Sequence, residues 1–232
     1  MSYVRDDLAA PGFFDLSKDQ LWDDLEGAYG AVLSLTQNSP ERIGAWKLGG
    51  TTPLTQQIFN VSDLYFGPIY ETEVFEAGST LTLPLTECKV ELEIACRIGE
   101  DGIDAWTICA EMPSSGIKDL PDRGVTALVA DRCAAGALIL GPPHPVNTIG
   151  DAPKSGVDLV SNGAVLTTGG TDGLTDAPLN IANAFLTKAR DLGFEPRRGQ
   201  WIATGGMTPC VEVDRQGSYN IPNGPGFTLD LP

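Results

Sequence analysis

Two stretches in which apolar and polar residues alternate, at 80–98 and 105–112, constrain the fold of this chain most strongly. Both are rich in Val, Ile, Leu and Thr. A period of two is the pattern of half-buried β-strands, because successive side chains point to opposite faces of a sheet. The turn-forming residues at 99–102 separate the two stretches. A pair of adjacent β-strands is therefore expected.

Further strands and a few helices are expected on either side of this pair. Helices are predicted where apolar residues recur at helical spacing, and strands where they alternate. The predicted elements are a helix at 18–35 capped by Ser17, an extended piece at 44–52, a helical turn at 55–59, a segment at 125–140 that begins as helix and ends as strand, a hairpin at 156–168 around Asn162-Gly163, a helix at 178–192 stopped by Gly193, and closing strands at 201–213 and 227–231 joined by a turn-rich stretch. The fold class that follows is α+β, mostly β.

The length of 232 residues fits one hydrophobic core. We therefore expect a single domain, with an N-terminal helical arm at 1–44 and a β core at 45–232. Because the chain has neither a long apolar run nor a basic and apolar leader, we expect a cytoplasmic protein. The five cysteines are odd in number and lack Cys-x-x-Cys spacing, which indicates reduced thiols.

Charge and histidine content exclude several functions. Against 15 Lys and Arg stand 31 Asp and Glu, a net charge of −16. Such a surplus repels phosphate backbones and anionic headgroups, so neither nucleic acid nor a membrane surface is an expected partner. The one histidine, His144, rules out zinc sites that need two or more imidazoles.

Two glutamates share one face of the first alternating stretch. Glu91 and Glu93 are two residues apart, a separation of about 7 Å along a strand. Uncompensated carboxylates this close raise each other's pKa, and a divalent cation between them removes the conflict. A hairpin can add Glu111, giving an oxygen-ligand site suited to Mg²⁺ or Mn²⁺. The alternative is a solvated outer face, since Glu71 and Glu73 repeat the spacing.

A single lysine stands out in the apolar segment 44–52. Lys47 lies just before the Gly49-Gly50 turn. A partly buried lysine can carry a proton or hold an anion. The alternative is a lysine whose ammonium extends from a strand edge into water.

The order of motifs resembles the fumarylacetoacetate hydrolase superfamily, in its branch of 2-keto-4-pentenoate hydratases and 4-oxalocrotonate decarboxylases. The resemblance runs from about Ala45 to the C-terminus. The motifs that carry it are Lys47-Leu-Gly-Gly-Thr51 with Gln56, Phe66-Gly-Pro-Ile69, Glu91-x-Glu93, Ala110-Glu111, Val129-Ala-Asp131 through Ala135-Gly136, Leu140-Gly141, Asn162-Gly163 and Thr204-Gly205. The resemblance implies a mixed-sheet roll or barrel with peripheral helices, and a homo-oligomer.

Carried over residue by residue, the resemblance also implies a site. Glu91, Glu93 and Glu111 would hold Mg²⁺ or Mn²⁺, Lys47 would assist proton transfer, and Thr204-Gly205 would hold the substrate carboxylate. The implied activity is that of a metal-dependent lyase, a hydratase that acts on a small 2-hydroxydienoate or 2-oxo acid through a metal-bound enolate. Decarboxylation or C–C hydrolysis of a related oxo-diacid is an alternative. A catalytically silent subunit is another, and a decarboxylase or hydratase partner would fit either.

The chain departs from the hydratase pattern in places that bear on the site. Hydratases tend to carry an acid/base aspartate shortly before Gly67, and here Tyr65 occupies the aligned position. Either Tyr65 takes the proton role, Asp63 reaches in by a small shift, or water addition is lost. In addition, Arg132 replaces a common asparagine.

Overall fold

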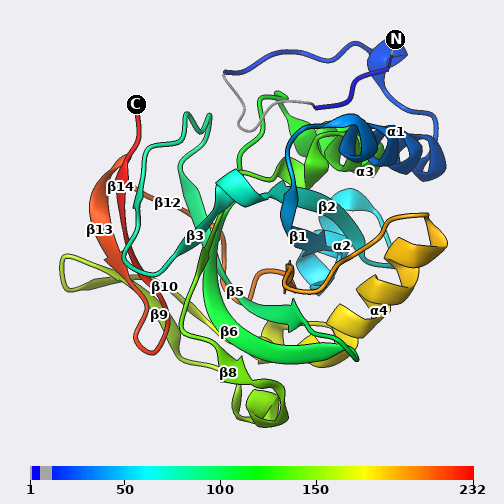
Figure 1. Cartoon of the computed structure of the whole chain (residues 1–232). Coiled ribbons are helices and arrows are strands. Elements are labelled where there is room, and N and C mark those ends of the chain that lie inside the picture. The colour runs from blue at the N-terminus through cyan, green and yellow to red at the C-terminus, as the bar shows by residue number, and fades with distance from the viewer. Residues whose placement is uncertain (1, 6–11) are drawn as a thin grey trace.

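The computed structural model describes residues 2–5 and 12–232 of the chain. Two β-sheets and four α-helices form the described part (Figure 1). The elements are α1 Leu25–Asn38, β1 Ile43–Gly49, α2 Pro53–Phe59, β2 Tyr65–Tyr70, β3 Val74–Glu76, β4 Thr80–Leu81, β5 Lys89–Ile98, β6 Ile103–Met112, α3 Leu120–Ala130, β7 Ala137–Leu140, β8 His144–Pro145, β9 Val157–Ser161, β10 Ala164–Gly169, α4 Pro178–Asp191, β11 Trp201–Ala203, β12 Val211–Glu212, β13 Gln216–Asn220 and β14 Gly226–Asp230.

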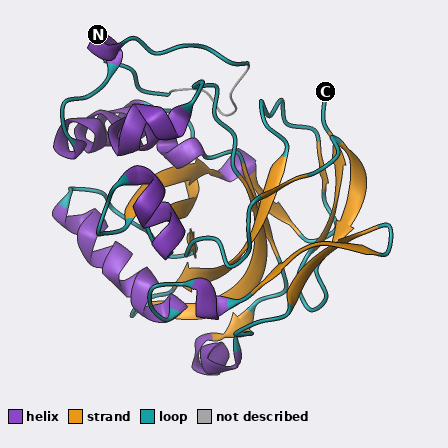
Figure 2. Ribbon diagram, turned by 180° about the vertical axis from the view of Figure 1, so that it is seen from behind, coloured by secondary structure: helices purple, strands orange, loops and turns teal. Residues whose placement is uncertain are grey.

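The larger sheet holds nine strands in the order β2-β1-β11-β5-β6-β7-β3, with β12 paired to β5 and β8 to β6. It is mixed, because β1 runs parallel to β11 and β3 parallel to β7, whereas β5 and β6 are antiparallel. The smaller sheet has the order β10-β9-β13-β14-β4. The larger sheet curls, and the helices lie along its outside (Figures 1 and 2). The predicted α+β, mostly β mixed-sheet class is confirmed.

Aromatic side chains fill the space between this sheet and the helices. Trp46 is fully buried, with its ring centroid 5.4 Å from that of Phe185 on α4 and 5.7 Å from that of Phe194. Phe66 on β2 lies 4.7 Å from Tyr29 on α1. Each such pair adds about 0.5–1.5 kcal/mol beyond the area it buries. The cluster therefore fixes β1 and β2 against α1 and α4.

The opposite face of the same strands carries small residues. Because side chains alternate along a strand, Ala45 and Lys47 point away from the face that holds Trp46. Ala45, Ala95 and Ala203 pack together there, all fully buried. Small side chains leave room on this face, and the polar residues predicted to form a site lie at one end of it.

The predicted hairpin at 156–168 and the helix at 178–192 are confirmed. The predicted pairing of 80–98 with 105–112 is confirmed only from Lys89, because Thr80 and Leu81 form β4, which pairs with β14 in the smaller sheet. The helix predicted at 18–35 was wrong at its start, since α1 begins at Leu25. Asp24 is its N-cap and accepts a hydrogen bond of 2.8 Å from the Gly27 N–H. Before it, residues Lys18–Gln20 form one 3₁₀ turn. The Asp24 side chain caps α1, whereas the Ser17 hydroxyl donates to the Gln20 side chain of the 3₁₀ turn.

The closing segment also differs from the prediction. The strand predicted at 201–213 is two short strands, β11 and β12, joined by a loop at 204–210. In addition, β13 lies within the stretch predicted to be turns, where it pairs with β14. The loop that interrupts the predicted strand turns out to cover the site.

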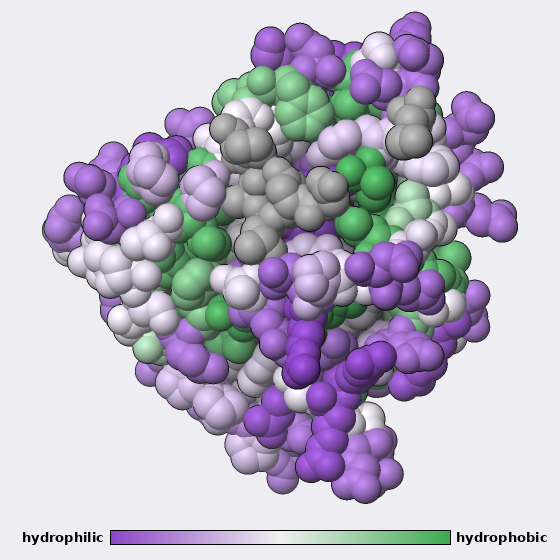
Figure 3. Space-filling view, turned by 45° about the horizontal axis from the view of Figure 1, so that its top comes forward, coloured by the Kyte–Doolittle hydropathy of each residue, from purple (hydrophilic) through white to green (hydrophobic). Residues whose placement is uncertain are grey.

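The N-terminal residues are tied to the core. The Arg5 guanidinium is buried and donates to the Ser114 carbonyl at 2.8 Å, while the Tyr3 hydroxyl donates to Asp131 at 2.7 Å. On the face in Figure 3, hydrophilic side chains form most of the periphery. Within the described ranges, no helix has the length and apolar character needed to cross a membrane.

Candidate active site

The β5–β6 hairpin brings three carboxylates together. Its register places Glu91 opposite Glu111, and Glu93 opposite Cys109. Cross-strand partners share a face, so all three glutamates point the same way. One carboxylate oxygen from each lies within 4.8 Å of the others. Glu93 and Glu111 are fully buried, and Glu91 is partly buried. The solvated outer face considered above is therefore excluded.

Lys47 joins the cluster from β1. Its Nζ lies 2.9 Å from each of the two Glu111 carboxylate oxygens. The ammonium is almost fully buried, so the alternative of a lysine reaching into water from a strand edge is wrong. Three carboxylates and one ammonium leave a surplus of negative charge in a buried place, which is costly without a further cation.

The loop at 204–210 closes over the carboxylates. The Gly205 N–H donates to Glu93 Oε2 at 2.7 Å. Gly205 has a φ of +107°, which favours glycine. A Cβ at Gly206 would collide with Glu91 Oε2. The glycine pair therefore lets the backbone approach two of the three carboxylates closely.

The donor set fits a hard divalent cation. Glu93 Oε1 is buried and has no hydrogen-bond partner among the described residues. A buried carboxylate oxygen without a partner is costly and calls for a ligand. Oxygen donors of this kind suit Mg²⁺ or Mn²⁺. Glu91, Glu93 and Glu111 are the residues that would hold the ion.

The site perturbs the acid-base chemistry of its own residues. Burial raises the pKa of the Glu111 carboxyl to about 8, with Lys47 opposing the shift and Glu91 adding to it. Burial, together with Glu91 and Glu111, raises the pKa of Glu93 well above its usual range. Burial lowers the pKa of Lys47, but the carboxylates of Glu111 and Glu91 outweigh it and raise that pKa above its usual value. Lys47 is thus a cation at neutral pH.

Metal affinity is expected to fall as the pH drops from about 8 to about 6. The metal-free carboxylates hold protons in this window, since the Glu111 pKa lies near 8, and an ion must displace them. Each displaced proton costs about tenfold in affinity per pH unit. Calorimetric titration with Mg²⁺ at three pH values measures this dependence, and a flat profile would contradict it.

The stability of the metal-free fold depends on pH in the opposite direction to the metal affinity. A carboxyl whose folded-state pKa is raised from 4.5 to about 8 binds more protons in the folded than in the unfolded protein between those values. The metal-free fold therefore loses stability as the pH rises through this window. Thermal melts with and without Mg²⁺ should diverge as the pH increases, because the ion then stabilises a weaker metal-free fold.

The structure separates the two residues considered for the missing aspartate. Tyr65 is buried opposite Gly49, and a Cβ on that glycine would collide with its ring. Burial raises the pKa of the Tyr65 phenol; Cys133 and Glu91 add to the shift and Lys47 opposes it. Asp63 is exposed and forms an ion pair of 2.7 Å with Lys188. Tyr65 thus lies on the face of the β1–β2 pair that carries Lys47, whereas the Asp63 side chain is exposed to solvent.

Thr204 and Gly205 lie beside the carboxylates, and the hydroxyl of the first and the N–H of the second already donate hydrogen bonds within the protein. The Thr204 hydroxyl donates to the Ile94 carbonyl at 2.9 Å and is fully buried. The Gly205 N–H is bonded to Glu93. Sequence reasoning assigned no role to Thr51, whose side chain contacts Gly205. Its position after Lys47 and a glycine pair was the available signal.

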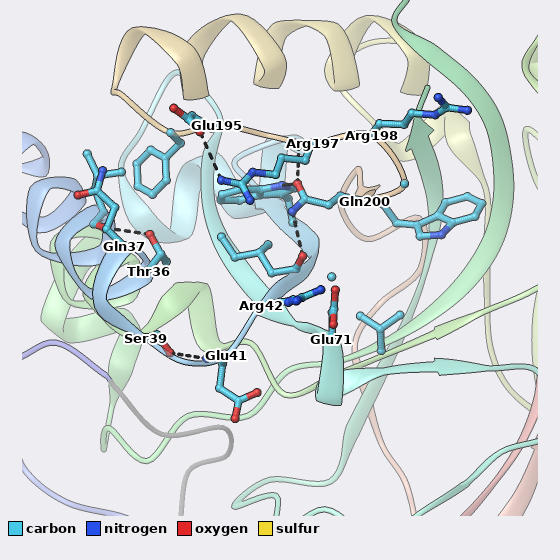
Figure 4. A pocket seen from close by; sticks show the side chains of 18 of the residues that line it. Thr36, Gln37, Ser39, Glu41, Arg42, Glu71, Glu195, Arg197, Arg198 and Gln200 are labelled. Atoms are coloured by element: carbon cyan, nitrogen blue, oxygen red, sulfur yellow. Dashed lines mark hydrogen bonds and ion pairs between the residues drawn. The ribbon is translucent and has the colours of Figure 1, made fainter. Parts of the chain in front are cut away.

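A separate groove of about 1050 Å³ lies at the other end of the same strands (Figure 4). Ile43, where β1 begins, and Trp201, where β11 begins, line it, whereas Lys47 and Gly205 lie toward the far ends of those strands. The Gln200 side-chain amide forms internal hydrogen bonds: it accepts from the Trp46 indole and donates to the Ile43 carbonyl. This groove is distinct from the carboxylate site.

Curated relatives of the chain are enzymes. No protein-family model matches the chain. A 2-keto-4-pentenoate hydratase of Burkholderia vietnamiensis is 27% identical over 199 residues, which cover 80% of this chain and 76% of the relative. A 2-hydroxyhexa-2,4-dienoate hydratase of Comamonas testosteroni is 23% identical, over 78% of this chain and 74% of the relative.

Solved structures agree in fold. A 4-oxalocrotonate decarboxylase from Pseudomonas putida, complexed with magnesium and adipate, superposes with a TM-score of 0.78 at 18% identity, over 89% of this chain and 86% of that one. A fumarylpyruvate hydrolase from Pseudomonas aeruginosa, in complex with Mn²⁺ and pyruvate, superposes with a TM-score of 0.57 at 14% identity. The match covers 84% of this chain and 94% of that one. These divalent ions agree with the metal expected here. The chain is thus similar in sequence to the 2-keto-4-pentenoate hydratases and has the fold of the fumarylacetoacetate hydrolase family, which confirms the resemblance predicted from its motifs.

Proposed function

We propose that this chain is a divalent-metal-dependent hydratase that acts on a small 2-hydroxydienoate or 2-oxo acid. The observation that carries the proposal is the buried cluster of Glu91, Glu93 and Glu111, with Lys47 paired to it. The hydratase relatives support the choice of reaction. A homo-oligomer, and a decarboxylase or hydratase partner, stay predictions.

The residues of the site would have two roles, which are to stabilise negative charge on the substrate and to transfer protons. A divalent ion held by the three glutamates would supply positive charge to an oxo or enol oxygen beside a carboxylate. Lys47 keeps its proton at neutral pH and lies within reach of the same place. It would stabilise negative charge that develops on the substrate oxygen, and pass a proton when the enol becomes a ketone.

Tyr65 is the residue that we assign to proton transfer at the carbon chain. It is buried, neutral at ordinary pH and within electrostatic range of Lys47 and Glu91. A neutral phenol can donate a hydrogen bond or a proton, and the positive charge of Lys47 favours the phenolate that would remain. Tyr65 would thus stand where related hydratases carry an aspartate.

Decarboxylation of an oxo-diacid is the second candidate. The observation that favours it is the position of Asp63, which is exposed and ion-paired with Lys188. Loss of carbon dioxide needs stabilised negative charge on the oxo oxygen, and does not need a group that activates water. The fold match to a 4-oxalocrotonate decarboxylase agrees with this alternative.

A spectrophotometric assay separates these candidates. With Mg²⁺ and 2-hydroxypenta-2,4-dienoate, hydration removes the conjugated diene and its ultraviolet absorbance. Loss of absorbance only when both metal and protein are present is the expected result. Release of carbon dioxide from an oxo-diacid, without diene loss, would indicate the decarboxylase. Neither reaction, with Mg²⁺ bound, would indicate a catalytically silent relative.

Replacing Tyr65 with phenylalanine is expected to lower kcat for hydration by about 10²–10⁴-fold, the usual effect of losing a general acid or base. Mg²⁺ affinity should change little, because the carboxylates remain. Tyr219→Phe is the matched control, since that hydroxyl donates to the Asp214 carbonyl in the smaller sheet. Steady-state kinetics with calorimetry measure both effects. A normal kcat in Tyr65→Phe would remove Tyr65 from the mechanism.

A further inference from the structure

The Thr51 hydroxyl is buried without a partner. Its side chain is in the segment that follows β1, and the residue is only 2% exposed. Thr51 Oγ1 makes no hydrogen bond to any described residue. Burying a hydroxyl without a hydrogen bond is unfavourable, and such groups in a folded protein call for an explanation.

Neighbouring buried threonines do not share this property. The Thr204 hydroxyl donates to the Ile94 carbonyl at 2.9 Å. The Thr208 hydroxyl accepts from the Leu92 N–H at 3.0 Å. The Thr107 hydroxyl, farther along β6, donates to the Pro142 carbonyl at 2.9 Å. The unsatisfied hydroxyl is therefore particular to Thr51 within this group.

Thr51 lies beside the carboxylate cluster. A Cβ at Gly205 would collide with Thr51 Oγ1, so this oxygen rests against the Gly205 backbone. The N–H of the same glycine donates to Glu93. Gly50, with a φ of +69°, turns the chain between Lys47 and Thr51. The hydroxyl thus lies next to a residue that touches the proposed metal ligands, on the chain that carries Lys47.

We propose that Thr51, rather than Thr204, holds a carboxylate oxygen of the 2-oxo acid. This inference rests on the proposed function, since it concerns the substrate of the same site. The Thr51 hydroxyl is free to donate, whereas that of Thr204 already donates to a backbone carbonyl. A hydroxyl that donates to a carboxylate makes a charge-assisted hydrogen bond, which is stronger than a neutral one. Substrate would supply the partner that the hydroxyl lacks.

Stability and binding should respond in opposite directions to Thr51→Val. Valine has nearly the shape of threonine without the hydroxyl, so the variant removes a buried unsatisfied group. Its melting temperature is expected to equal or exceed that of the unchanged protein. Its affinity for oxalate, a small mimic of the 2-oxo carboxylate, is expected to fall about 10–100-fold in the presence of Mg²⁺.

The experiment is calorimetric titration of Mg²⁺, and then of oxalate in saturating Mg²⁺, into the unchanged protein, Thr51→Val, Thr51→Ser and Thr107→Val. Thr51→Ser keeps the hydroxyl and should restore most of the oxalate affinity. Thr107→Val removes a satisfied hydroxyl away from the site, so it should lower the melting temperature and leave oxalate affinity unchanged. Mg²⁺ affinity should be alike in all four proteins.

Equal oxalate affinity in Thr51→Val and the unchanged protein would overturn the role of Thr51 and leave the proposed function standing. Weak oxalate binding in Thr51→Ser, or a loss of Mg²⁺ affinity in Thr51→Val, would also overturn it, because the effect would then be structural. Absence of Mg²⁺-dependent oxalate binding in the unchanged protein would overturn the proposed function, and this inference with it.

Discussion

Glu93→Gln is expected to weaken divalent-metal binding by at least about 100-fold and to lower turnover by about 1000-fold. Glu93 lies two residues along β5 from Glu91, within 4.8 Å of both other carboxylates, and its Oε1 is a buried oxygen without a hydrogen-bond partner among the described residues. Glutamine keeps one oxygen for the Gly205 N–H but loses the charge that the ion requires. A loss of turnover of about 1000-fold corresponds to several kcal/mol of lost charge stabilisation in the transition state.

Calorimetry with Mg²⁺ and the diene assay measure these losses. Glu71→Gln is the matched control, since Glu71 belongs to the other Glu-x-Glu pair and is exposed. The fold should survive Glu93→Gln, because burial and neighbouring carboxylates already raise the Glu93 pKa and the variant removes that cost. Mg²⁺ should therefore raise the melting temperature of the unchanged protein and of Glu71→Gln, but not of Glu93→Gln. Normal Mg²⁺ binding by Glu93→Gln would rule out the carboxylate cluster as the metal site.

The carboxylate cluster could be predicted because its geometry is local. Alternation places Glu91 and Glu93 on one face of a strand, and a short hairpin brings Glu111 opposite Glu91. The periodicity of the strand and the turn-forming residues that follow it are both visible in the sequence. The same reasoning anticipated the class of the fold, since apolar and polar residues alternate in several of its strands, such as β5, β9 and β14.

The substrate side of the site could not be predicted in this way. Whether Asp63 or Tyr65 faces inward depends on the pairing of β2 with β1, which places Tyr65 opposite Gly49. The availability of a threonine hydroxyl depends on long-range contacts: Thr204 meets Ile94 across 110 residues. Likewise β13 consists of residues common in turns, and its pairing with β14 makes it a strand.

The pair Glu71 and Glu73 shows the limit of spacing as a signal. It repeats the separation of Glu91 and Glu93, yet the structure gives it a different role. Glu73 is fully buried and forms two hydrogen bonds with the Arg132 guanidinium, at 2.8 and 2.9 Å. Its partner lies 59 residues away, and nothing in the local sequence indicates it.

Breaking this pair is expected to cost about 3–5 kcal/mol of stability, because either single change removes the opposite charge that faces a buried group. Glu73→Gln keeps an acceptor for the Tyr70 N–H but removes the carboxylate charge that faces the Arg132 guanidinium. Arg132→Met removes the guanidinium, which also stacks 4.5 Å over the Tyr70 ring. For a chain of this size the loss corresponds to a fall in Tm of roughly 6–20 °C. Thermal and urea unfolding measure it.

A double-mutant cycle tests whether the loss belongs to the pair. Glu73→Gln combined with Arg132→Met removes both charges, so the combined loss should be smaller than the sum of the two single losses by about 2 kcal/mol or more. Additive losses would mean that the two side chains act independently.

The position of Arg132 explains why such a pair is needed next to the site. Arg132, Cys133 and Ala134 all have a positive φ, of 53°, 56° and 56°. For residues other than glycine this left-handed turn costs about 1–2 kcal/mol each. A Cβ at Gly67 would collide with the Arg132 carbonyl, and Gly67 pairs with Lys47 across β1 and β2. The ion pair thus holds a strained turn against β2, the strand that pairs with the Lys47 strand.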